Sequence, residues 1–205
     1  GVTVLGSARF HCWKREGHGS LDMATALKFS CDCYFYEIAR RAGIDRIAET
    51  ARLFGLGSVG GLDLPGEKPG LIPDTQWKKA TFGDIWHPGE TLVAGIGQGF
   101  ITTTPLQLCV MTARIANGGY AVKPRLVRRI SDESQNDEGN PVFPSLELSP
   151  DHLKLLRTGM DMVSNTERGT AYRSRIDIPG MELAGKTGTS QVRRITMAER
   201  ARGVL

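Results

Sequence analysis

Residues 185–189 (Gly-Lys-Thr-Gly-Thr) are the strongest local signal for chemistry in the sequence. Lys186 supplies a fixed positive charge, and the hydroxyls of Thr187 and Thr189 can hydrogen-bond a carboxylate. Gly188 lets a ligand approach the backbone closely, because no Cβ is in the way. A main-chain N–H just after it can serve as an oxyanion donor. If the segment is an edge strand beside a groove, it can bind a carboxylate and stabilise an oxyanion.

The same segment fits a second template, the phosphate-binding loop of nucleotide hydrolases. Residues 180–187 match G-x-x-x-x-G-K-[ST]. That loop requires a helix after it, whose N-terminal N–H groups meet the phosphates. Here the four spacer residues are Met-Glu-Leu-Ala, and the residues after Thr187, Gly-Thr-Ser-Gln-Val, favour a strand. These residues do not favour the template, but a nucleotide-binding protein stays as one hypothesis, and nucleotide titration would test it.

Ser30 and Asp32 form a second polar group, far upstream and near a predicted helix boundary. A serine followed two residues later by an aspartate can simply cap a helix. Combined with Lys-Thr-Gly in this chain order, the pair resembles motifs of the serine acyltransferases that react with penicillin. Their signature is S-x-x-K, then S-x-N or S-D-N, then K-T-G.

The elements that must position these groups are mostly helices, with strands expected near the end of the chain. Apolar spacing predicts helices over 20–31, 32–42, 44–53, 105–116 and 150–163, the first capped by Ser20 and the fourth by Thr104. Strand character is predicted for 120–130 and 181–192. Residues 1–19 look irregular, and the Gly/Pro-rich stretch 60–86 predicts a long surface excursion. This order favours an α/β (α+β) domain with an antiparallel or mixed sheet.

Composition excludes several classes of protein. The chain has 205 residues, 40% of them apolar and 23% charged, as in an ordinary soluble globular domain. Its net charge of +4 comes from basic residues that are mostly scattered, so we expect no nucleic-acid partner. No apolar run reaches the ~18 residues that span a bilayer.

Several motifs match one family in order along nearly the whole chain. The chain is similar to the transpeptidase domain of class B penicillin-binding proteins, most of all to the cell-elongation type of Gram-negative bacteria. The matching segments are 17–19 (Gly-His-Gly), 30–36, 43–45, 61–64, 95–99 (Gly-Ile-Gly-Gln-Gly), 104–107, 117–119 and 186–189. The resemblance implies the penicillin-binding and serine β-lactamase-like fold, with helices packed on a mainly antiparallel sheet. Residues 1–205 would be a partial transpeptidase domain, incomplete at both ends.

The resemblance implies a D,D-transpeptidase that cross-links peptidoglycan stem peptides through an acyl-enzyme. Ser30 would relay a proton to the leaving amine, and Asp32, where many relatives have Asn, would support the lysine network. Lys186 would give electrostatic support to Ser30 and to the substrate carboxylate. Thr187 and Thr189 would bind that carboxylate beside Gly188, and the Thr189 N–H would form half of the oxyanion hole.

The nucleophile motif S-x-x-K does not occur in the sequence. In the family it lies upstream of the second motif, so here it would precede residue 1. We therefore expect this chain to be an internal fragment that does not react with penicillin by itself.

Cys12, His18 and Cys31 are soft ligands suited to zinc. The resemblance implies a zinc ion beside the active site, with Cys12 in place of an acidic ligand and a further ligand before residue 1. His11 is a rival ligand, whereas Cys33 and Cys109 are expected to be core thiols. A disulfide between two of the cysteines and unrelated buried thiols are the open alternatives.

The resemblance also implies partners and a location. The catalytic domain would lie in the periplasm, held at the inner membrane by an N-terminal anchor outside this sequence. Partners would be a shape-determining glycosyltransferase and a rod-shape scaffold protein, and β-lactams would react with the full-length protein. The alternatives are a division-type relative and a non-catalytic sensor or structural domain. An S-x-x-K upstream would separate enzyme from sensor.

Overall fold

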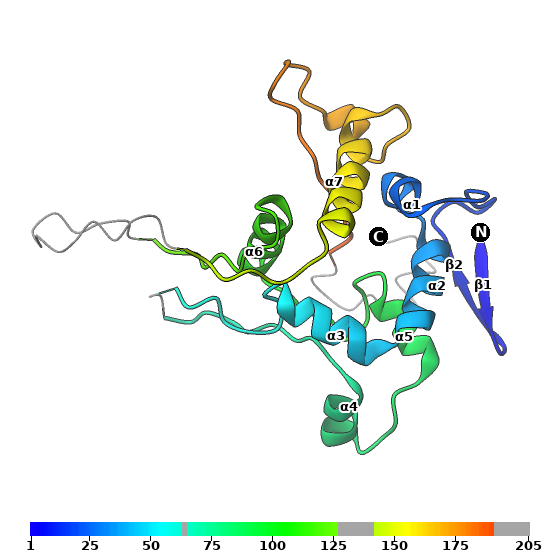
Figure 1. The fold of residues 1–205 in the computed structure, drawn as a ribbon. Coiled ribbons are helices and arrows are strands. Elements are labelled where there is room, and N and C mark those ends of the chain that lie inside the picture. Colours follow the sequence, from blue (N-terminus) through cyan, green and yellow to red (C-terminus); the bar gives the residue numbers. More distant parts are fainter. Residues whose placement is uncertain (63–64, 127–141, 191–205) are drawn as a thin grey trace, which may run out of the picture.

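The computed structural model describes residues 1–62, 65–126 and 142–190 (Figure 1). Within these residues, helices predominate and a single antiparallel hairpin forms the sheet, giving a mixed α/β architecture. The elements are β1 (Val2–Leu5), β2 (Ala8–His11), α1 (Met23–Phe29), α2 (Asp32–Ala42), α3 (Ile44–Leu53), α4 (Thr75–Phe82), α5 (Pro88–Ala94), α6 (Pro105–Ala116), α7 (Pro150–Asn165) and the short 3-10 helix η1 (Tyr172–Ser174).

The hairpin β1–β2 corrects the expectation that residues 1–19 are irregular. Val2 pairs with His11 and Leu5 with Ala8, so the strands are joined by a two-residue turn. Gly6 lies at the first central position of this turn with φ 58°, a conformation that glycine adopts without steric cost. The glycines that seemed to break the pattern are thus partly what makes the hairpin possible.

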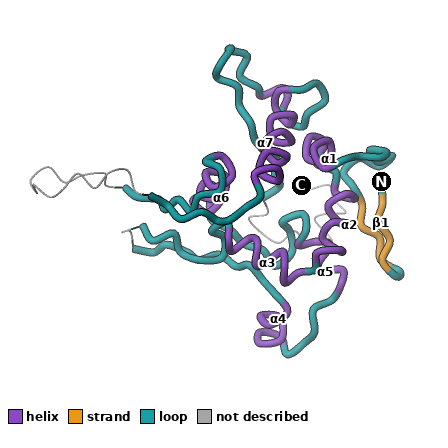
Figure 2. The backbone as a smooth tube through the Cα atoms, in the orientation of Figure 1, coloured by secondary structure: helices purple, strands orange, loops and turns teal. Residues whose placement is uncertain are grey.

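Two helix pairs form the frame around the site (Figures 1 and 2). Helix α1 lies against α7, and α2 lies against α5 with the hairpin on another side of it. Glycines allow both helix pairs to approach closely. A Cβ on Gly159 of α7 would come 2.5 Å from Leu27 Cδ1, and one on Gly95, just after α5, would come 2.3 Å from Ala39 Cβ.

Several predicted helix boundaries are confirmed by their caps. The Thr104 hydroxyl accepts a hydrogen bond from the Gln107 N–H at 3.2 Å, and Pro105 begins α6. Gly43 ends α2 as expected. The cap of α1 was predicted wrongly, because Asp22 rather than Ser20 accepts the Thr25 N–H, at 2.8 Å.

Helices α4 and α5 were missed by the sequence analysis. The stretch 60–86 was expected to be a surface excursion, yet α4 begins after Asp74, whose carboxylate accepts the Trp77 N–H at 2.8 Å. Both helices are short, with eight and seven residues, so their apolar periodicity is too brief to be recognised. An aspartate cap in α4 and Pro88 at the start of α5 were the available signals.

The predicted strands are not formed as regular strands in the described residues. From 120 to 126 only Tyr120 makes a bridge, to Ser145, and 181–190 has no ladder partner. An extended segment becomes a strand only when a neighbour supplies its hydrogen bonds, and no described strand lies beside 181–190. The remaining predicted positions, 127–130 and 191–192, lie outside the described residues.

None of the described helices is long and apolar enough to cross a membrane.

Tyr36 links helix α2 to the hairpin and makes stability depend on pH. Its hydroxyl donates to the His11 carbonyl at 3.3 Å, and only 5% of the residue is exposed. Burial, reinforced by the negative charge of Asp32, raises the pKa of Tyr36 to about 12. The phenol of the unfolded chain ionises near its ordinary value of 10.0. Between these values the unfolded state releases its proton first, so rising pH favours unfolding.

We predict that the free energy of unfolding falls by about 1 kcal/mol between pH 10 and pH 11 because of Tyr36. Denaturant titrations of the wild type and of Tyr36→Phe measure this contribution. The variant should lose that part of the slope, whereas Tyr120→Phe, at an exposed tyrosine, should keep it. An unchanged slope in Tyr36→Phe would contradict the assignment.

Candidate active site

A cleft of about 870 Å³ lies where five separate segments meet, one of them the loop after β2 that carries Trp13. The end of α1 and the start of α2 supply one wall, and the loop after α5 supplies another. The loop after α7 and the extended segment 186–189 complete it. Figure 2 shows that loops rather than strands connect these helices. The lining residues include Trp13, Ser30, Asp32, Gln98, Arg168, Thr170 and residues 186–189.

Lys186 and Ser30 meet across this cleft, although 156 positions separate them in the sequence. The Lys186 ammonium donates to Ser30 Oγ at 2.7 Å and to its neighbour's carbonyl, Thr187 O, at 2.8 Å. Desolvation lowers the pKa of Lys186, and the carboxylate of Asp32 opposes this shift. The two side chains therefore converge in one cleft, as expected, while Lys186 as a whole remains exposed at its surface.

Ser30 owes its position to an unusual backbone conformation. It caps the C-terminus of α1 with φ 51° and ψ 52°, in the left-handed region that glycine usually fills. Its N–H donates to the Leu27 carbonyl at 3.1 Å, which closes the last turn. Cys31 then serves as N-cap of α2, so the serine projects from a sharp turn between two helices.

Trp13 is a cleft residue that the sequence analysis missed. Its indole Nε1–H is shared by the carbonyls of Phe29 and Ser30, each at 3.0 Å. Its main-chain N–H donates to Asp32 Oδ2, also at 3.0 Å. Trp13 thus bonds to both sides of the turn between α1 and α2, where Ser30 and Asp32 lie. The Asp32 carboxylate is also close enough to oppose the lowering of the Lys186 pKa by desolvation. The only signal in the sequence was that Trp13 directly follows Cys12, a candidate zinc ligand.

The segment 186–189 is fastened by side chains of neighbouring loops. Gln98, from the Gly-rich loop after α5, donates its Nε2–H to the Thr189 carbonyl at 3.0 Å. The hydroxyls of Thr170 and Thr187 hydrogen-bond each other at 2.9 Å. Among the described residues, no atom other than those of its chain neighbours lies within 4 Å of where a Cβ on Gly188 would be, so this glycine faces open space there. The hydroxyls and backbone of the segment thus form one wall of the cleft.

This geometry does not fit the nucleotide-binding alternative. A phosphate-binding loop leads directly into a helix, whose N–H groups bind the phosphates. Residues 188–190 are not helical, and among the described residues the element that comes before the segment is the 3-10 helix η1 rather than a strand. Residues 180–187 therefore match that template in sequence but lack the structure of a phosphate-binding loop.

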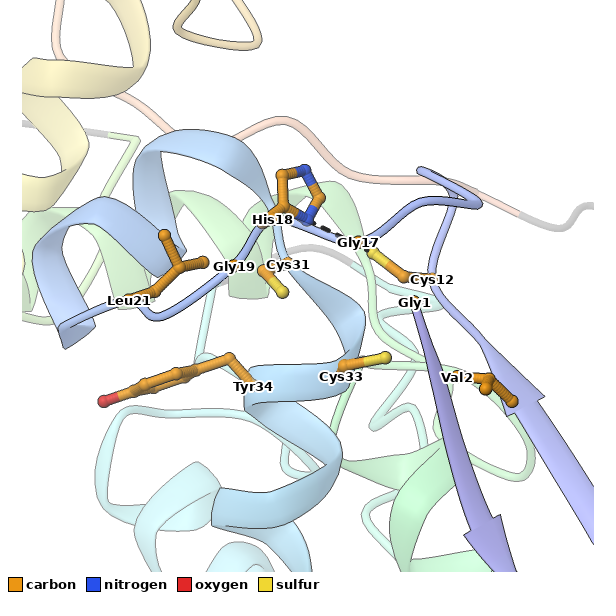
Figure 3. Close-up of a pocket in the computed structure, with 10 residues that line it drawn as sticks. All are labelled: Gly1, Val2, Cys12, Gly17, His18, Gly19, Leu21, Cys31, Cys33 and Tyr34. Carbon is orange, nitrogen blue, oxygen red and sulfur yellow. Dashed lines mark hydrogen bonds between the residues drawn. The ribbon is translucent and has the colours of Figure 1, made fainter.

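Cys12, His18 and Cys31 gather in a second, smaller site (Figure 3), and Cys31 directly follows Ser30 in the sequence. Their sulfur and nitrogen ligand atoms all lie within 4.8 Å of one another, and Cys12 Sγ is 3.5 Å from His18 Nδ1. The surrounding pocket has a volume of about 290 Å³. The other ring nitrogen, His18 Nε2, is buried and has no hydrogen-bond partner among the described residues.

The electrostatics of this group favour a neutral imidazole. Burial lowers the pKa of His18, the charge of Lys14 adds to the shift, and the carboxylate of Asp32 opposes it. Burial also raises the pKa of the Cys31 thiol. A cation held between these atoms would compensate the cost of burying two thiolates.

The remaining histidine and cysteines, His11, Cys33 and Cys109, meet the expectations only in part. His11 is exposed at the end of β2 and stands outside the group. Cys33 is half-buried and packs against the core around Cys12 and Cys31. Cys109 is exposed, which contradicts the expectation of a core thiol, because α6 turns Gln107 and Val110 inward instead. All four cysteines are free thiols.

Comparison with known proteins agrees with this geometry. Residues 2–196 match the family model described as the penicillin-binding protein transpeptidase domain. The chain belongs to this transpeptidase family. The peptidoglycan D,D-transpeptidase MrdA of Acinetobacter baumannii is 38% identical over 95% of the chain, and that of Escherichia coli K12 is 34% identical over 90%. This transpeptidase chain spans 29% of the length of each of these two relatives.

Solved structures place the transpeptidase chain in the penicillin-binding protein 2 type. A complex of penicillin-binding protein 2 with MreC from Helicobacter pylori superposes with a TM-score of 0.82 at 35% identity. It covers 93% of this chain and 34% of that one. Penicillin-binding protein 2 of Pseudomonas aeruginosa, in complex with WCK 5153, gives 0.82 at 38% identity, covering 95% and 44%. The expected fold is therefore confirmed.

Gln98 offers a test of how the Lys-Thr-Gly-Thr segment of this transpeptidase domain is held. Removing its amide in Gln98→Ala leaves the Thr189 carbonyl without its partner, so residues 185–190 should open more often. We predict amide hydrogen exchange about tenfold faster in this segment, with the melting temperature nearly unchanged. Gln76→Ala, at an exposed position of α4, is the matched control. Unchanged exchange at 185–190 would show that Gln98 does not fasten the segment.

Proposed function

We propose that the protein containing this chain is a peptidoglycan D,D-transpeptidase of the elongation type. The observation that carries the proposal is the hydrogen bond from Lys186 Nζ to Ser30 Oγ, inside a cleft walled by Thr187 and Thr189. A hydroxyl that is hydrogen-bonded to an ammonium can accept and pass on a proton, which acyl transfer requires. The names of the curated relatives support the same activity.

In the proposed reaction, a serine of an S-x-x-K motif outside this sequence attacks the penultimate D-Ala carbonyl of a stem peptide. Thr187 and Thr189 bind the terminal carboxylate, and the Thr189 N–H stabilises the oxyanion. The attacking hydroxyl loses its proton as the new C–O bond forms, and Ser30, in contact with Lys186, passes that proton to the leaving D-Ala amine as the C–N bond breaks. An amine of a neighbouring stem then attacks the acyl-enzyme, loses a proton along the same route, and restores the serine.

We further propose that this domain works in the periplasm at the inner membrane, with a glycosyltransferase and a scaffold protein as partners. Two solved structures similar to this chain support the choice of partners. One is the Helicobacter pylori complex with MreC, and the other is a peptidoglycan synthase complex that coordinates polymerization and crosslinking.

Covalent labelling by a fluorescent penicillin tests the proposed activity. The full-length protein should be labelled, and Lys186→Met should slow labelling at least 100-fold, because it removes the charge beside Ser30. Lys154→Met, at an exposed lysine of α7, is the matched control and should label normally. The 205-residue chain alone, which contains no S-x-x-K, should stay unlabelled.

Either of two results would contradict the proposal. Labelling of the 205-residue chain would show that another nucleophile acts. Absence of labelling in the full-length wild type would favour the non-catalytic sensor instead. Saturable nucleotide binding by the full-length protein would revive the phosphate-loop hypothesis.

We also propose that Cys12, His18 and Cys31 hold a structural zinc ion. Two thiols and one imidazole are the donor types that zinc prefers, and their ligand atoms already lie within 4.8 Å of one another. The burial of Cys12 and Cys31 fits such an ion, as does the neutral state favoured for His18. The buried His18 Nε2, which has no hydrogen-bond partner in the described part of the chain, fits it too. When bound, zinc would tie the loop after β2 to the turn that carries Ser30.

Metal analysis of the full-length protein tests the zinc proposal. We expect zinc at a near-stoichiometric level, and Cys31→Ser should remove most of it and lower the melting temperature by several degrees. Cys33→Ser, two residues away and outside the group, should retain the metal. Zinc-free wild-type protein, or a Cys12–Cys31 disulfide found in its place, would overturn the proposal.

A further inference from the structure

The side chain of Trp13 is unusually exposed to solvent for a tryptophan. The residue is 62% exposed, although a tryptophan side chain gains most of its stabilising effect from burial. Its ring lies edge-on to His18, with centroids 5.2 Å apart, and lines the cleft. A side chain that buries so little of its area contributes mainly through its polar contacts.

Those polar contacts all fall on the turn that carries Ser30. The indole N–H reaches the carbonyls of Phe29 and Ser30, and the main-chain N–H reaches the Asp32 carboxylate, each at 3.0 Å. One residue thus contacts three positions of a four-residue stretch. These contacts join the end of α1 to the start of α2 on the cleft side.

The turn needs such a partner for a physical reason. The last carbonyls of a helix lack intrahelical donors, and α1 has only seven residues. Ser30 adopts a left-handed conformation that costs a residue with a Cβ about 1 kcal/mol or more. A donor that satisfies the carbonyls of Phe29 and Ser30 together stabilises this conformation over ordinary ones.

We infer that Trp13 is a positioning residue for the proposed acyl transfer: its indole N–H holds the turn that aims the Ser30 hydroxyl at Lys186. The inference rests on the proposed function. Ser30 Oγ lies 2.7 Å from Lys186 Nζ, and a rotation of the turn toward a relaxed backbone would lengthen this contact. Trp13 acts through Ser30, so its loss should slow the chemical step rather than weaken binding.

The test measures acylation of the full-length protein by a fluorescent penicillin over a range of concentrations. Such data separate the non-covalent dissociation constant from the first-order acylation rate. Trp13→Phe keeps an aromatic ring and removes the N–H. We expect its acylation rate to fall about tenfold, with the dissociation constant within about twofold of wild type and the melting temperature nearly unchanged.

Two further proteins make the test decisive. Trp86→Phe is the matched control, because Trp86 also donates its indole N–H, to Thr91 Oγ1 at 2.9 Å, but does not line the cleft. It should acylate at the wild-type rate. Replacing Trp13 by β-(3-benzothienyl)alanine preserves the bicyclic shape and deletes only the N–H, so it should reproduce the loss seen in Trp13→Phe.

A wild-type acylation rate in the benzothienyl variant would overturn the inference, even if Trp13→Phe failed to fold. So would a Trp13→Phe protein in which binding, acylation and melting temperature all decline together, since that pattern belongs to a general structural role. If the wild type itself were not labelled, the proposed function would fail as well. Labelled wild type with an unaffected variant would reject the role of Trp13 alone.

Discussion

The contact between Lys186 and Ser30 is the constraint on which the rest of the site depends. It closes a loop of 156 residues and joins an extended segment that has no strand neighbour in the described residues. Other bonds bring this segment into place along α7: Gly185 N–H donates to the Met160 carbonyl at 3.1 Å, and Asn165 Nδ2–H to the Leu183 carbonyl at 3.1 Å. The segment therefore follows α7 before it reaches the cleft, and the helices determine where the ammonium can lie.

The two helix pairs explain why the cleft has fixed dimensions. Gly159 lets α1 lie close against α7, which fixes the serine turn relative to the extended segment. Gly95 lets α5 lie close against α2, which places the Gly-rich loop and Gln98 opposite the same turn. Because protein interiors are close-packed, small shifts of either pair would move the polar groups at the cleft by comparable amounts. Packing of apolar surfaces thus sets the geometry of a site that is itself polar.

The sequence predicted the chemistry of the site better than its surroundings. Ser30, Asp32 and Lys186 were recognisable because their side-chain types and order repeat a family pattern, and helices of ten or more residues had clear periodicity. The hairpin, α4 and α5 are too short for periodicity to show. Trp13 was missed because its role comes from carbonyl groups 16 and 17 positions away, which no local pattern encodes. The exposed Cys109 was misjudged because buried Gln107, which bonds the Ser58 and Pro69 carbonyls, takes the inward-facing position on α6.

A double-mutant cycle on acylation of the full-length protein tests the central claim most directly. Ser30→Ala, Lys186→Met and the double variant would be compared with wild type for the first-order rate of penicillin acylation. If the two side chains act through their mutual contact, the double variant should be about as slow as the slower single variant. If the two losses multiply, Ser30 and Lys186 act independently, and their convergence in one cleft would not be the basis of the reaction.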